Sequence, residues 1–563
     1  MANNGYKWIA LSNTTLATLL ATIDASIMLI AMPAVFRGIG LNPLQPGNSF
    51  YLLWMILGFL VVTSVLVVSL GSLGDMYGRV RMYNLGFVVY TIASLILAVD
   101  PLHGPAGADW LIVFRIFQGV GAAFLLANTG AILTDAFPSN QRGLALGITN
   151  IVGISGQFIG LILGGVLAPI NWRLIFLVSV PPGIAGTWWS YKRLREIGTR
   201  RHAPIDWAGN VTFAVGLVLV MIGITYGIRP YGNSAMGWHS PFVIGALASG
   251  VALLAAFVAV ELNVEHPMFR LSLFRITAYS AGAVATFLSS VARGGLMFML
   301  IIWLQGIWLP RHGYGFESTP LHAAISMLPL TFGFLTAGPV SGYLSDRYGS
   351  RGFATAGMLG TAAAFGLLET LPVNFDYTTF AGVLLLMGLS MGFFASPNRA
   401  GVMNSLPPEY RGAGGGMNQT FQNSAQVLSI GIFFTLMIIG LSAKLPGTLA
   451  AGLTAHGVSA ATAAHVSHLP PVSVIFAAFL GYNPVRTLLG PTVLSHVSPA
   501  NAAALTNRSF FPNLIEGPFR TGLHEAFAFA IVACLVAAAA SWVRGAKPLA
   551  HDVRAAEAIE PPA

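Results

Sequence analysis

Long apolar runs alternate with short polar segments along most of the chain. A helix needs about 20 mainly apolar residues to cross a lipid bilayer. Inside lipid every backbone N–H and C=O group has to be satisfied within the segment, so runs of that length are expected to be helices. The pattern predicts an all-α polytopic membrane protein with 14 transmembrane helices, at residues 8–32, 50–72, 82–100, 109–134, 142–168, 173–192, 207–228, 241–262, 278–304, 319–344, 353–371, 378–398, 412–442 and 523–544.

The composition supports the same class. Of the 563 residues, 55% are hydrophobic and only 8% are charged, whereas a soluble domain carries about 25% charged residues. The net charge of +9 does not require a nucleic-acid partner, because Lys and Arg concentrate in the cytoplasmic loops of membrane proteins. Here they are more frequent in the loops that share a side with the two termini. We therefore expect both termini to be cytoplasmic and no nucleic acid to be bound.

The sequence offers little support for an enzyme or a metal site. There is no G-x-x-x-x-G-K-[ST] loop for ATP phosphates and no G-x-S-x-G nucleophile turn with a matching base. The single cysteine, Cys534, lies in an apolar run and leaves no internal disulfide. One polar region carries His456, His465, His468 and His496. Because no acid or cysteine accompanies them, a solvated segment is favoured over a zinc site. We expect no cofactor, no metal and no enzymatic activity.

A short glycine-rich motif occurs twice, each time between two apolar runs. Residues Gly71 to Arg81 and Gly342 to Arg351 both contain G-x-x-x-D-x-x-G. A second pair of similar stretches, Pro138 to Gly143 and Pro408 to Gly412, precedes spans 5 and 13. A motif repeated in mid-chain indicates two related halves. Spans 1–6 therefore correspond to spans 9–14, which predicts two six-helix bundles with spans 7 and 8 inserted between them.

The C-terminal half contains a segment, 443–522, that is too long for a simple loop. Its apolar stretch from Val472 to Leu480 is too short to span, so a re-entrant or surface-lying hairpin is expected there. The chain then divides into an N-terminal bundle, two inserted helices with linkers, a C-terminal bundle that includes this segment, and a cytoplasmic tail, at 1–200, 201–275, 276–544 and 545–563.

Several motifs together resemble those of the major facilitator superfamily, and within it the 14-helix drug:proton antiporters. Gly71 to Arg81 is similar to the superfamily's loop signature, and Leu111 to Gly121, with Arg115, to its span-4 signature. Three further stretches resemble signatures of the antiporter group. In span 1 these are Thr22-Ile23-Asp24 and Ala31-Met32-Pro33, and in span 6 they are Trp172-Arg173, Phe176 and Val180-Pro181. At the start of span 7 the matching stretch is Ile205-Asp206-Trp207-Ala208-Gly209. The resemblance implies a bacterial plasma-membrane transporter that exchanges protons for hydrophobic compounds.

The span-5 signature of these antiporters, G-x-x-x-G-P-x-x-G-G, is matched except at one position. Leu161 stands where the proline is expected. Because that proline is tied to antiport in the group, antiport and other modes of coupling both stay open. Small residues spaced by four favour close helix packing. We expect the glycines to let spans of opposite halves pack closely and slide; they are Gly156, Gly160, Gly164 and Gly165.

Three ionisable side chains inside spans are candidates for proton coupling and substrate binding, because charges at this depth are costly and usually paired or functional. Asp24, midway in span 1, is expected to hold a proton in alternation with a cationic or polar substrate; the alternative is a permanent structural ion pair. Arg293 lies at the equivalent depth of span 9 and could pair with Asp24 across one cavity, or leave room for an anionic or amphiphilic substrate; the alternative is snorkelling to a lipid headgroup. For Arg115 the resemblance implies proton coupling, against a structural arginine bound to backbone carbonyls.

Amide side chains are expected to line the substrate cavity. In span 13 they follow an i, i+4, i+8 spacing and form one polar stripe. Amides hydrogen-bond a substrate without adding charge, although the same residues often join neighbouring helices. Met297, Phe298 and Trp303 could add adaptable apolar contacts. The candidate cavity-lining amides are Gln118, Asn128, Gln157, Gln305, Asn418, Gln419, Gln422, Asn423 and Gln426.

The repeated loop motif is expected to act as a conformational latch. The resemblance implies that Asp75 caps the start of span 13, near Gly412 to Gly416. A carboxylate at a helix N-terminus is stabilised by about 0.3–1 kcal/mol. Asp346 is the acid of the second copy. The other residues expected to shape and hold the loop are Gly71, Gly78, Arg79 and Arg81.

These observations favour an exporter of hydrophobic or amphiphilic compounds, driven by protons through alternating access of two bundles around a midplane site. An exporter of a lipid or lipid-like metabolite is the alternative, suggested by segment 443–522. The third hypothesis is a sensor or assembly partner that transports nothing. The absence of a coupling acid would favour it. The expected partners are a small hydrophobic or amphiphilic substrate, protons and the lipid bilayer, and the chain is expected to be a monomer.

Overall fold

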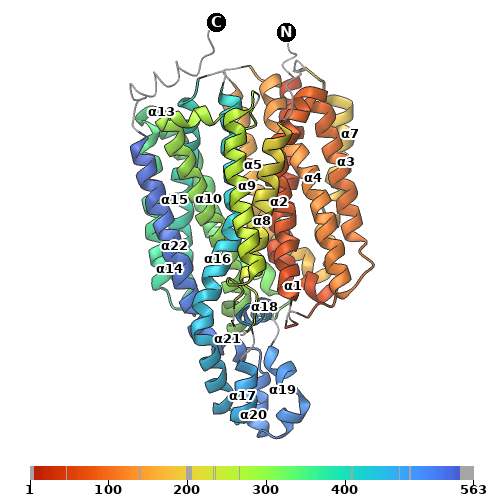
Figure 1. The fold of residues 1–563 in the computed structure, drawn as a ribbon, viewed down its shortest axis with the longest axis vertical. Coiled ribbons are helices and arrows are strands. Elements are labelled where there is room, and N and C mark those ends of the chain that lie inside the picture. Colours follow the sequence, from red (N-terminus) through yellow and green to blue (C-terminus); the bar gives the residue numbers. More distant parts are fainter. Residues whose placement is uncertain are drawn as a thin grey trace.

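The computed structural model describes residues 5–544, apart from 43, 46, 139–140, 198–205, 233, 235, 266, 408–409, 468–469 and 481–482. The described residues form helices and connecting segments, with one isolated bridge between Tyr231 and Ser234. The long helices run roughly along one axis as a tall bundle (Figure 1). We call the end where α1 (Tyr6–Gly38) begins and α22 (Glu516–Val543) ends the terminal end, and the opposite end the distal end.

Seven helices form the first bundle. α1 packs on α4 and α5, while α3 packs on α4 and α7. The chain reverses between α2 and α3 at Gly78, whose φ of +112° is a conformation that favours glycine. The remaining helices of this bundle are α2 (Asn48–Tyr77), α3 (Arg79–Ala98), α4 (Gly104–Ala136), α5 (Arg142–Ile170), α6 (Leu174–Leu177) and α7 (Val180–Arg193).

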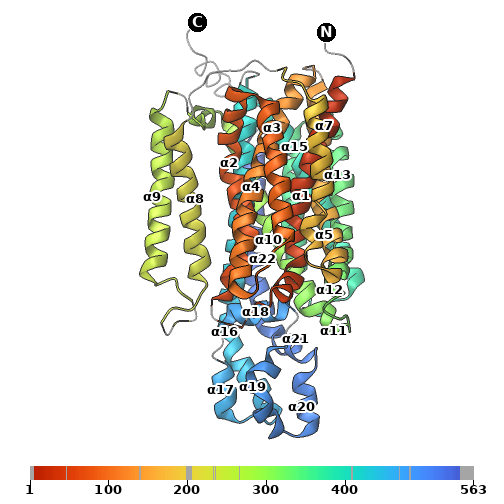
Figure 2. The same cartoon turned by 90° about the vertical axis from the view of Figure 1, so that its right-hand side faces the viewer.

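Helices α8 (Trp207–Gly227) and α9 (Pro241–Asn263) form a hairpin that stands beside the bundles (Figure 2). The Asp206 side chain starts α8 by accepting a hydrogen bond from the backbone N–H of Gly209 at 2.7 Å. α8 faces the bundles through α2 and α16, and the rings of Phe50 and Tyr226 lie 5.4 Å apart. α9 carries exposed apolar side chains suited to lipid: Phe242, Ile244, Val251, Val258 and Leu262.

The second bundle contains the longest helix, α16 (Arg411–Ala455), with 45 residues. At 1.5 Å per residue it is about 67 Å long, roughly twice the hydrocarbon thickness of a bilayer. It therefore extends past the distal end of the other helices (Figure 1). The other elements of this bundle are η2 (Leu271–Arg275), α10 (Thr277–Trp303), the π-helical η3 (Leu304–Trp308), α11 (Leu309–Arg311), α12 (Thr319–Ser326), α13 (Leu328–Tyr348), α14 (Ser350–Thr370), α15 (Tyr377–Asn404) and α22.

The segment between α16 and α22 is folded into helices. α17, α19 and α20 form a small cluster beyond the distal end (Figures 1 and 2). α18 instead packs on η3, α16 and α2, and every one of its residues is buried. A surface-lying hairpin at this stretch is therefore wrong, because its apolar side chains join the core of both bundles. The bounds are α17 (Ala460–Ser467), α18 (Pro471–Phe479), α19 (Pro484–Ser495), α20 (Pro499–Thr506) and α21 (Phe510–Leu514).

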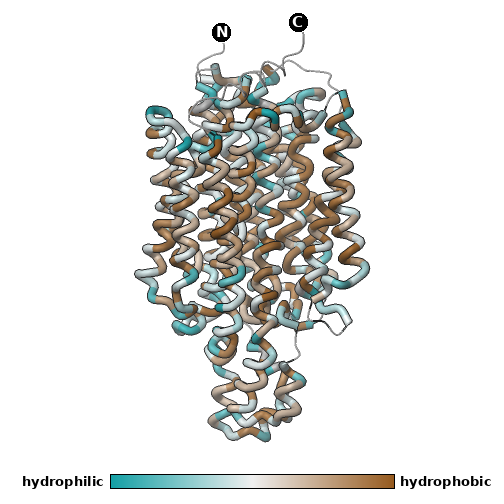
Figure 3. The backbone as a smooth tube through the Cα atoms, turned by 60° about the vertical axis from the view of Figure 1, so that its left-hand side comes forward, coloured by the Kyte–Doolittle hydropathy of each residue, from teal (hydrophilic) through white to brown (hydrophobic). Residues whose placement is uncertain are grey.

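Helices occupy all of the segments in which spans are expected, so the all-α membrane fold is confirmed. Apolar positions follow the long helices, whereas polar positions gather near their ends (Figure 3). Among the described residues, 12 helices are long and apolar enough to cross a membrane. Segment 173–192 is not among them because it breaks into α6 and α7, and α14 does not meet the same test. A count of 14 spans and cytoplasmic termini stay predictions.

Candidate transport site

A buried ionic cluster lies inside the first bundle. Asp24 on α1 forms an ion pair with Arg115 on α4, and the two side chains are 0% and 1% exposed. Gln118 lies one turn further along α4, on the same face. Its Nε2 donates to Asp24 Oδ1 at 3.1 Å, and its Oε1 accepts from Arg115 Nη1 at 2.8 Å. The acid and the arginine therefore neutralise each other within this bundle.

Two further helices hold the same cluster. Gln118 Nε2 also donates to Ser94 Oγ on α3 at 2.9 Å, and Arg115 Nε donates to the carbonyl of Met55 on α2 at 3.3 Å. The Arg115 guanidinium lies 4.5 Å from the centre of the Phe59 ring. A buried ion pair persists only when its remaining hydrogen-bonding groups are satisfied. A change of charge at Asp24 would consequently alter contacts among α1, α2, α3 and α4.

A small cavity of about 30 Å³ lies between the two bundles. It has room for only a few water molecules in this structure. Arg293 on α10 donates Nη1 to Gln157 Oε1 on α5 at 3.4 Å, across the cavity. The lining residues are Ala25, Ser26, Leu29, Leu60, Gln157 and Leu161 from the first bundle, and Arg293, Gly294, Met297, Gln426 and Ile430 from the second.

The bundles are closed against each other at the distal end. Gly165 of α5 lies so close to α12 that a β-carbon there would be 2.6 Å from Leu321 Cα. Gln305 in η3 donates Nε2 to the carbonyl of Ile30 at 3.3 Å. α18 packs between η3, α16 and α2 at the same end. Three independent contacts thus seal the cavity from the distal side.

The expected pairing of Asp24 with Arg293 is wrong for this structure. Asp24 faces α4, whereas the next residues along α1, Ala25 and Ser26, line the cavity. Equal depth in two spans places two residues at one level of the membrane. The side to which each points depends on helix rotation, which changes by about 100° per residue. The alternative, an acid paired with one arginine, describes this conformation.

Of the expected amides, Gln157 and Gln426 line the cavity. Gln118 belongs to the Asp24 cluster, and Gln305 joins the bundles at the distal end. Asn128 donates to the carbonyl of Phe124 at 2.9 Å and packs against Gly74 on α2. The rest of the α16 stripe lies outside the cavity lining: Asn418, Gln419, Gln422 and Asn423. Gln419 and Asn423 bond to each other at 3.0 Å.

Of the expected apolar contacts, Met297 lines the cavity, while Phe298 and Trp303 are buried elsewhere. Sequence reasoning did not single out Ala25, Leu29, Leu60 and Ile430. Apolar residues in a span carry no signal that separates a cavity wall from helix packing or a lipid contact. Only the assembled bundles show which face of each helix meets the cavity.

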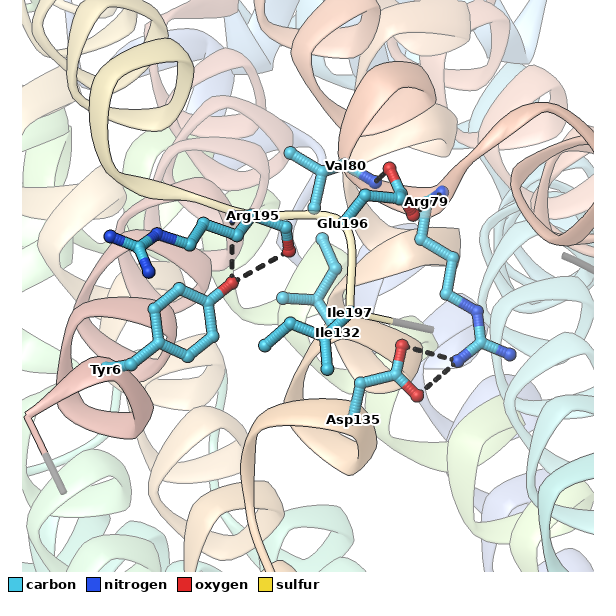
Figure 4. A pocket seen from close by; sticks show the side chains of 8 residues that line it. All are labelled: Tyr6, Arg79, Val80, Ile132, Asp135, Arg195, Glu196 and Ile197. Carbon is cyan, nitrogen blue, oxygen red and sulfur yellow. Dashed lines mark hydrogen bonds and ion pairs between the residues drawn. The ribbon is translucent and has the colours of Figure 1, made fainter. Parts of the chain in front are cut away.

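The motif Gly71 to Arg81, which joins the end of α2 to the start of α3, is held together within the first bundle (Figure 4). Glu196, in the segment after α7, accepts hydrogen bonds from the backbone N–H groups of Arg79 at 2.7 Å and Val80 at 3.1 Å. It therefore caps the positive end of α3. The Arg79 side chain is bound to Asp135 on α4 and to Asp75 on α2, each at 2.7 Å. Sequence reasoning missed Glu196 and Asp135, which lie far from the motif along the chain.

The expected contact of Asp75 with span 13 is wrong for this structure. The carboxylate pairs with Arg79, which lies one turn away, and the residue before α16, Tyr410, provides no side-chain cap. Within the described residues, Arg81 and Asp346 are exposed and form no ion pair. A β-carbon placed at Gly71 would lie 3.9 Å from the β-carbon of Ala127, which is an ordinary van der Waals contact.

The span-5 glycines mostly serve contacts within one bundle, which corrects the expectation of contacts between halves. β-Carbons at Gly156 and Gly160 would overlap Thr22 and Ser26 of α1, and one at Gly164 would lie 2.9 Å from the carbonyl oxygen of Ile27. Only Gly165 meets the opposite bundle. α5 and α1 therefore pack closely because small residues recur at every turn.

Within the described part of the chain, no group of three or more metal-binding side chains gathers. His456 and His496 donate Nδ1–H to the carbonyls of Gly452 and Thr492, at 2.8 and 2.7 Å. His468 lies outside the described residues.

Comparison with known proteins agrees with this architecture. Residues 14–205 and 202–430 both match the description "Major Facilitator Superfamily". The tetracenomycin C resistance and export protein of Streptomyces glaucescens is 26% identical over 99% of this chain and 95% of its own. The riboflavin transporter RibZ of Clostridioides difficile (strain 630) is 26% identical over 76% of this chain and 87% of its own.

Solved structures share the fold. A bacterial homolog to the human lysosomal transporter Spinster, in an inward-facing and unoccupied conformation, aligns with a TM-score of 0.59 at 15% identity. The alignment covers 96% of this chain and 98% of that one. At this identity the likeness concerns the arrangement of helices alone.

Proposed function

This chain belongs to the major facilitator superfamily, and we propose that it exports hydrophobic or amphiphilic compounds across the plasma membrane in exchange for protons. The observation that carries the proposal is the buried cluster of Asp24, Arg115 and Gln118 beside a cavity lined by both bundles. Export is supported by the tetracenomycin C resistance and export protein, which matches over nearly the whole chain.

Protonation of Asp24 is the proposed coupling step. A proton on the carboxylate removes its charge and leaves Arg115 buried without a counter-charge, which is costly. The arginine still has Gln118 and the Met55 carbonyl as acceptors, so the cost is reduced but not removed. α1 carries both Asp24 and the cavity residues Ala25 and Ser26. Loosening the contact between α1 and α4 therefore changes the cavity wall.

The two-bundle arrangement supports alternating access as the transport mechanism. The cavity lies between the bundles and is sealed at the distal end by α12, α18 and η3. Rocking of one bundle against the other would open that end and expose the same site to the other side. Substrate and proton then bind in turn to the two orientations, and no nucleotide is required.

Proton movement in proteoliposomes tests the proposal. We expect tetracenomycin C, added to vesicles that contain the full chain, to change the signal of an internal pH-sensitive dye. Asp24→Asn keeps the shape of the side chain and should abolish the signal. Asp109→Asn, the same change at an exposed acid of α4, is the matched control and should keep it. If Asp24→Asn still couples, the acid is not the proton carrier; if the native chain moves no protons, coupled export is wrong.

The helical cluster beyond the distal end favours a second candidate, export of a lipid or lipid-like metabolite. Asn483 Nδ2 donates to the carbonyls of Leu505 and Asn507 at 2.9 and 3.0 Å. The ends of the α19–α20 region are therefore close enough to join by a short linker. Removal of residues 484–506 should spare dye efflux and impair lipid export if the cluster guides a lipid. Equal loss of both activities would contradict this role.

A further inference from the structure

Two arginines of the second bundle reach across to amides of the first. Arg293 on α10 donates to Gln157 on α5 at 3.4 Å, and Arg399 on α15 donates Nη1 to Asn150 on α5 at 2.8 Å. Asn150 and Gln157 are seven residues apart, which is two helical turns, so they share one face of α5. The two contacts therefore follow one line along the seam between the bundles, from the cavity towards the terminal end.

Among the residues that the structure describes, neither arginine is paired with an acid. The ion pairs among the described residues include no carboxylate partner for Arg293 or Arg399. Asp24, which precedes the cavity residues Ala25 and Ser26 on α1, already has Arg115 as its partner. A guanidinium has five N–H donors, and Arg293 uses one of them in a long hydrogen bond. The cavity wall therefore carries a positive charge with free hydrogen-bonding capacity.

We propose that the cavity takes an amphiphilic anion, whose acidic group binds Arg293. This inference rests on the proposed export function and names the charge of its substrate. The planar guanidinium group can donate two parallel hydrogen bonds to a carboxylate, sulfonate or phosphate group. The amide NH₂ groups of Gln157 and Gln426 supply further donors on the same wall. Once the bundles move apart and the cavity widens, the apolar part of the substrate would lie against Leu29, Leu60, Leu161, Met297 and Ile430, which line it.

Arg399 places a second positive charge on the same seam between the bundles. Its side chain is exposed, while its donor meets Asn150 on the opposite bundle. The amide partners of the two arginines lie about 10 Å apart along α5, and a second cation on this seam draws an anion inwards and repels a cation. The cavity that results selects against the permanently cationic compounds that a free acid would attract.

A matched set of amphiphiles tests the charge preference. Octanesulfonate, octyltrimethylammonium and octanol share one alkyl chain, and the charges of the first two do not depend on pH. Binding is measured by titration calorimetry on the full chain in nanodiscs, with empty nanodiscs subtracted. We expect saturable binding of octanesulfonate about tenfold tighter than that of octyltrimethylammonium, as for hydrogen bonds to a charged group.

Variants locate the binding group. Arg293→Gln should lower octanesulfonate affinity to that of octanol, and Arg293→Lys should retain part of the preference because it keeps the charge but not the planar group. Octanol binding and the midpoint of thermal unfolding report whether the cavity of each variant is intact. Arg270→Gln is the control, because it removes a positive charge that stacks on Tyr410 and should leave the preference unchanged.

The outcomes separate this inference from the export proposal. Equal or tighter binding of octyltrimethylammonium, or an unchanged preference in Arg293→Gln, overturns the anion assignment. If tetracenomycin C still moves protons through Asp24 in that case, export stands without it. If octanesulfonate binds at Arg293 while no compound moves protons, the anion site stands and coupled export falls.

Discussion

At the scale of single residues, the site depends on which charges are satisfied. Asp24, Arg115 and Gln118 form a closed set of hydrogen bonds inside one bundle, whereas Arg293 faces the cavity with one long bond. Both arginines could be found from the sequence, because charged residues are rare within spans. Their different partners could not, because pairing depends on the rotation of each helix and on contacts between segments far apart in sequence.

The ion pair leads to a prediction about stability. Arg115→Ala leaves the Asp24 carboxylate buried without its counter-charge, and removal of one partner of a buried pair costs about 3–5 kcal/mol. The double variant Asp24→Asn with Arg115→Met removes both charges and should be more stable than Arg115→Ala. Thermal unfolding in detergent, followed by tryptophan fluorescence, compares the midpoints. Identical midpoints for the two variants would show that the pair is not buried as described.

At the scale of helices, close packing of α1 on α5 decides the shape of the first bundle. The glycine spacing predicts a closely packed face of α5 from sequence alone. It does not say which helix meets that face, and the structure gives α1 for three of the four glycines. The loop motif is similar: its glycine turn is visible in the sequence, but Glu196 as the cap of α3 depends on the fold.

Two glycines of α5 provide a matched pair for this packing. A β-carbon at Gly160 would overlap Ser26 and lie 2.5 Å from the carbonyl oxygen of Ile23, while one at Gly147 meets nothing within 4 Å. Gly160→Ala should destabilise the protein by about 1–3 kcal/mol through overpacking. Gly147→Ala should stabilise it by up to about 1 kcal/mol, because alanine favours a helix. Unfolding midpoints measure both; a neutral Gly160→Ala would mean that α1 and α5 lie further apart.

At the scale of the whole molecule, repeated motifs predict two related bundles, and two matches to the same family agree with them. The conformation is not encoded in that pattern, since one sequence has to adopt opposite orientations during transport. The sequence also did not reveal that α18 packs inside the protein. Nine apolar residues are too few to span, and only the fold shows that they are buried at the distal end.

Closure at the distal end leads to the last prediction. A β-carbon at Gly165 of α5 would lie 2.6 Å from Leu321 Cα on α12, so Gly165→Val should keep the distal end from closing. Because alternating access needs both orientations, the substrate-driven pH signal in proteoliposomes should be largely lost. Gly147→Val, on the same helix where a β-carbon meets nothing within 4 Å, is the matched control and should keep the signal. A native signal from Gly165→Val would show that the bundles need not close at this contact.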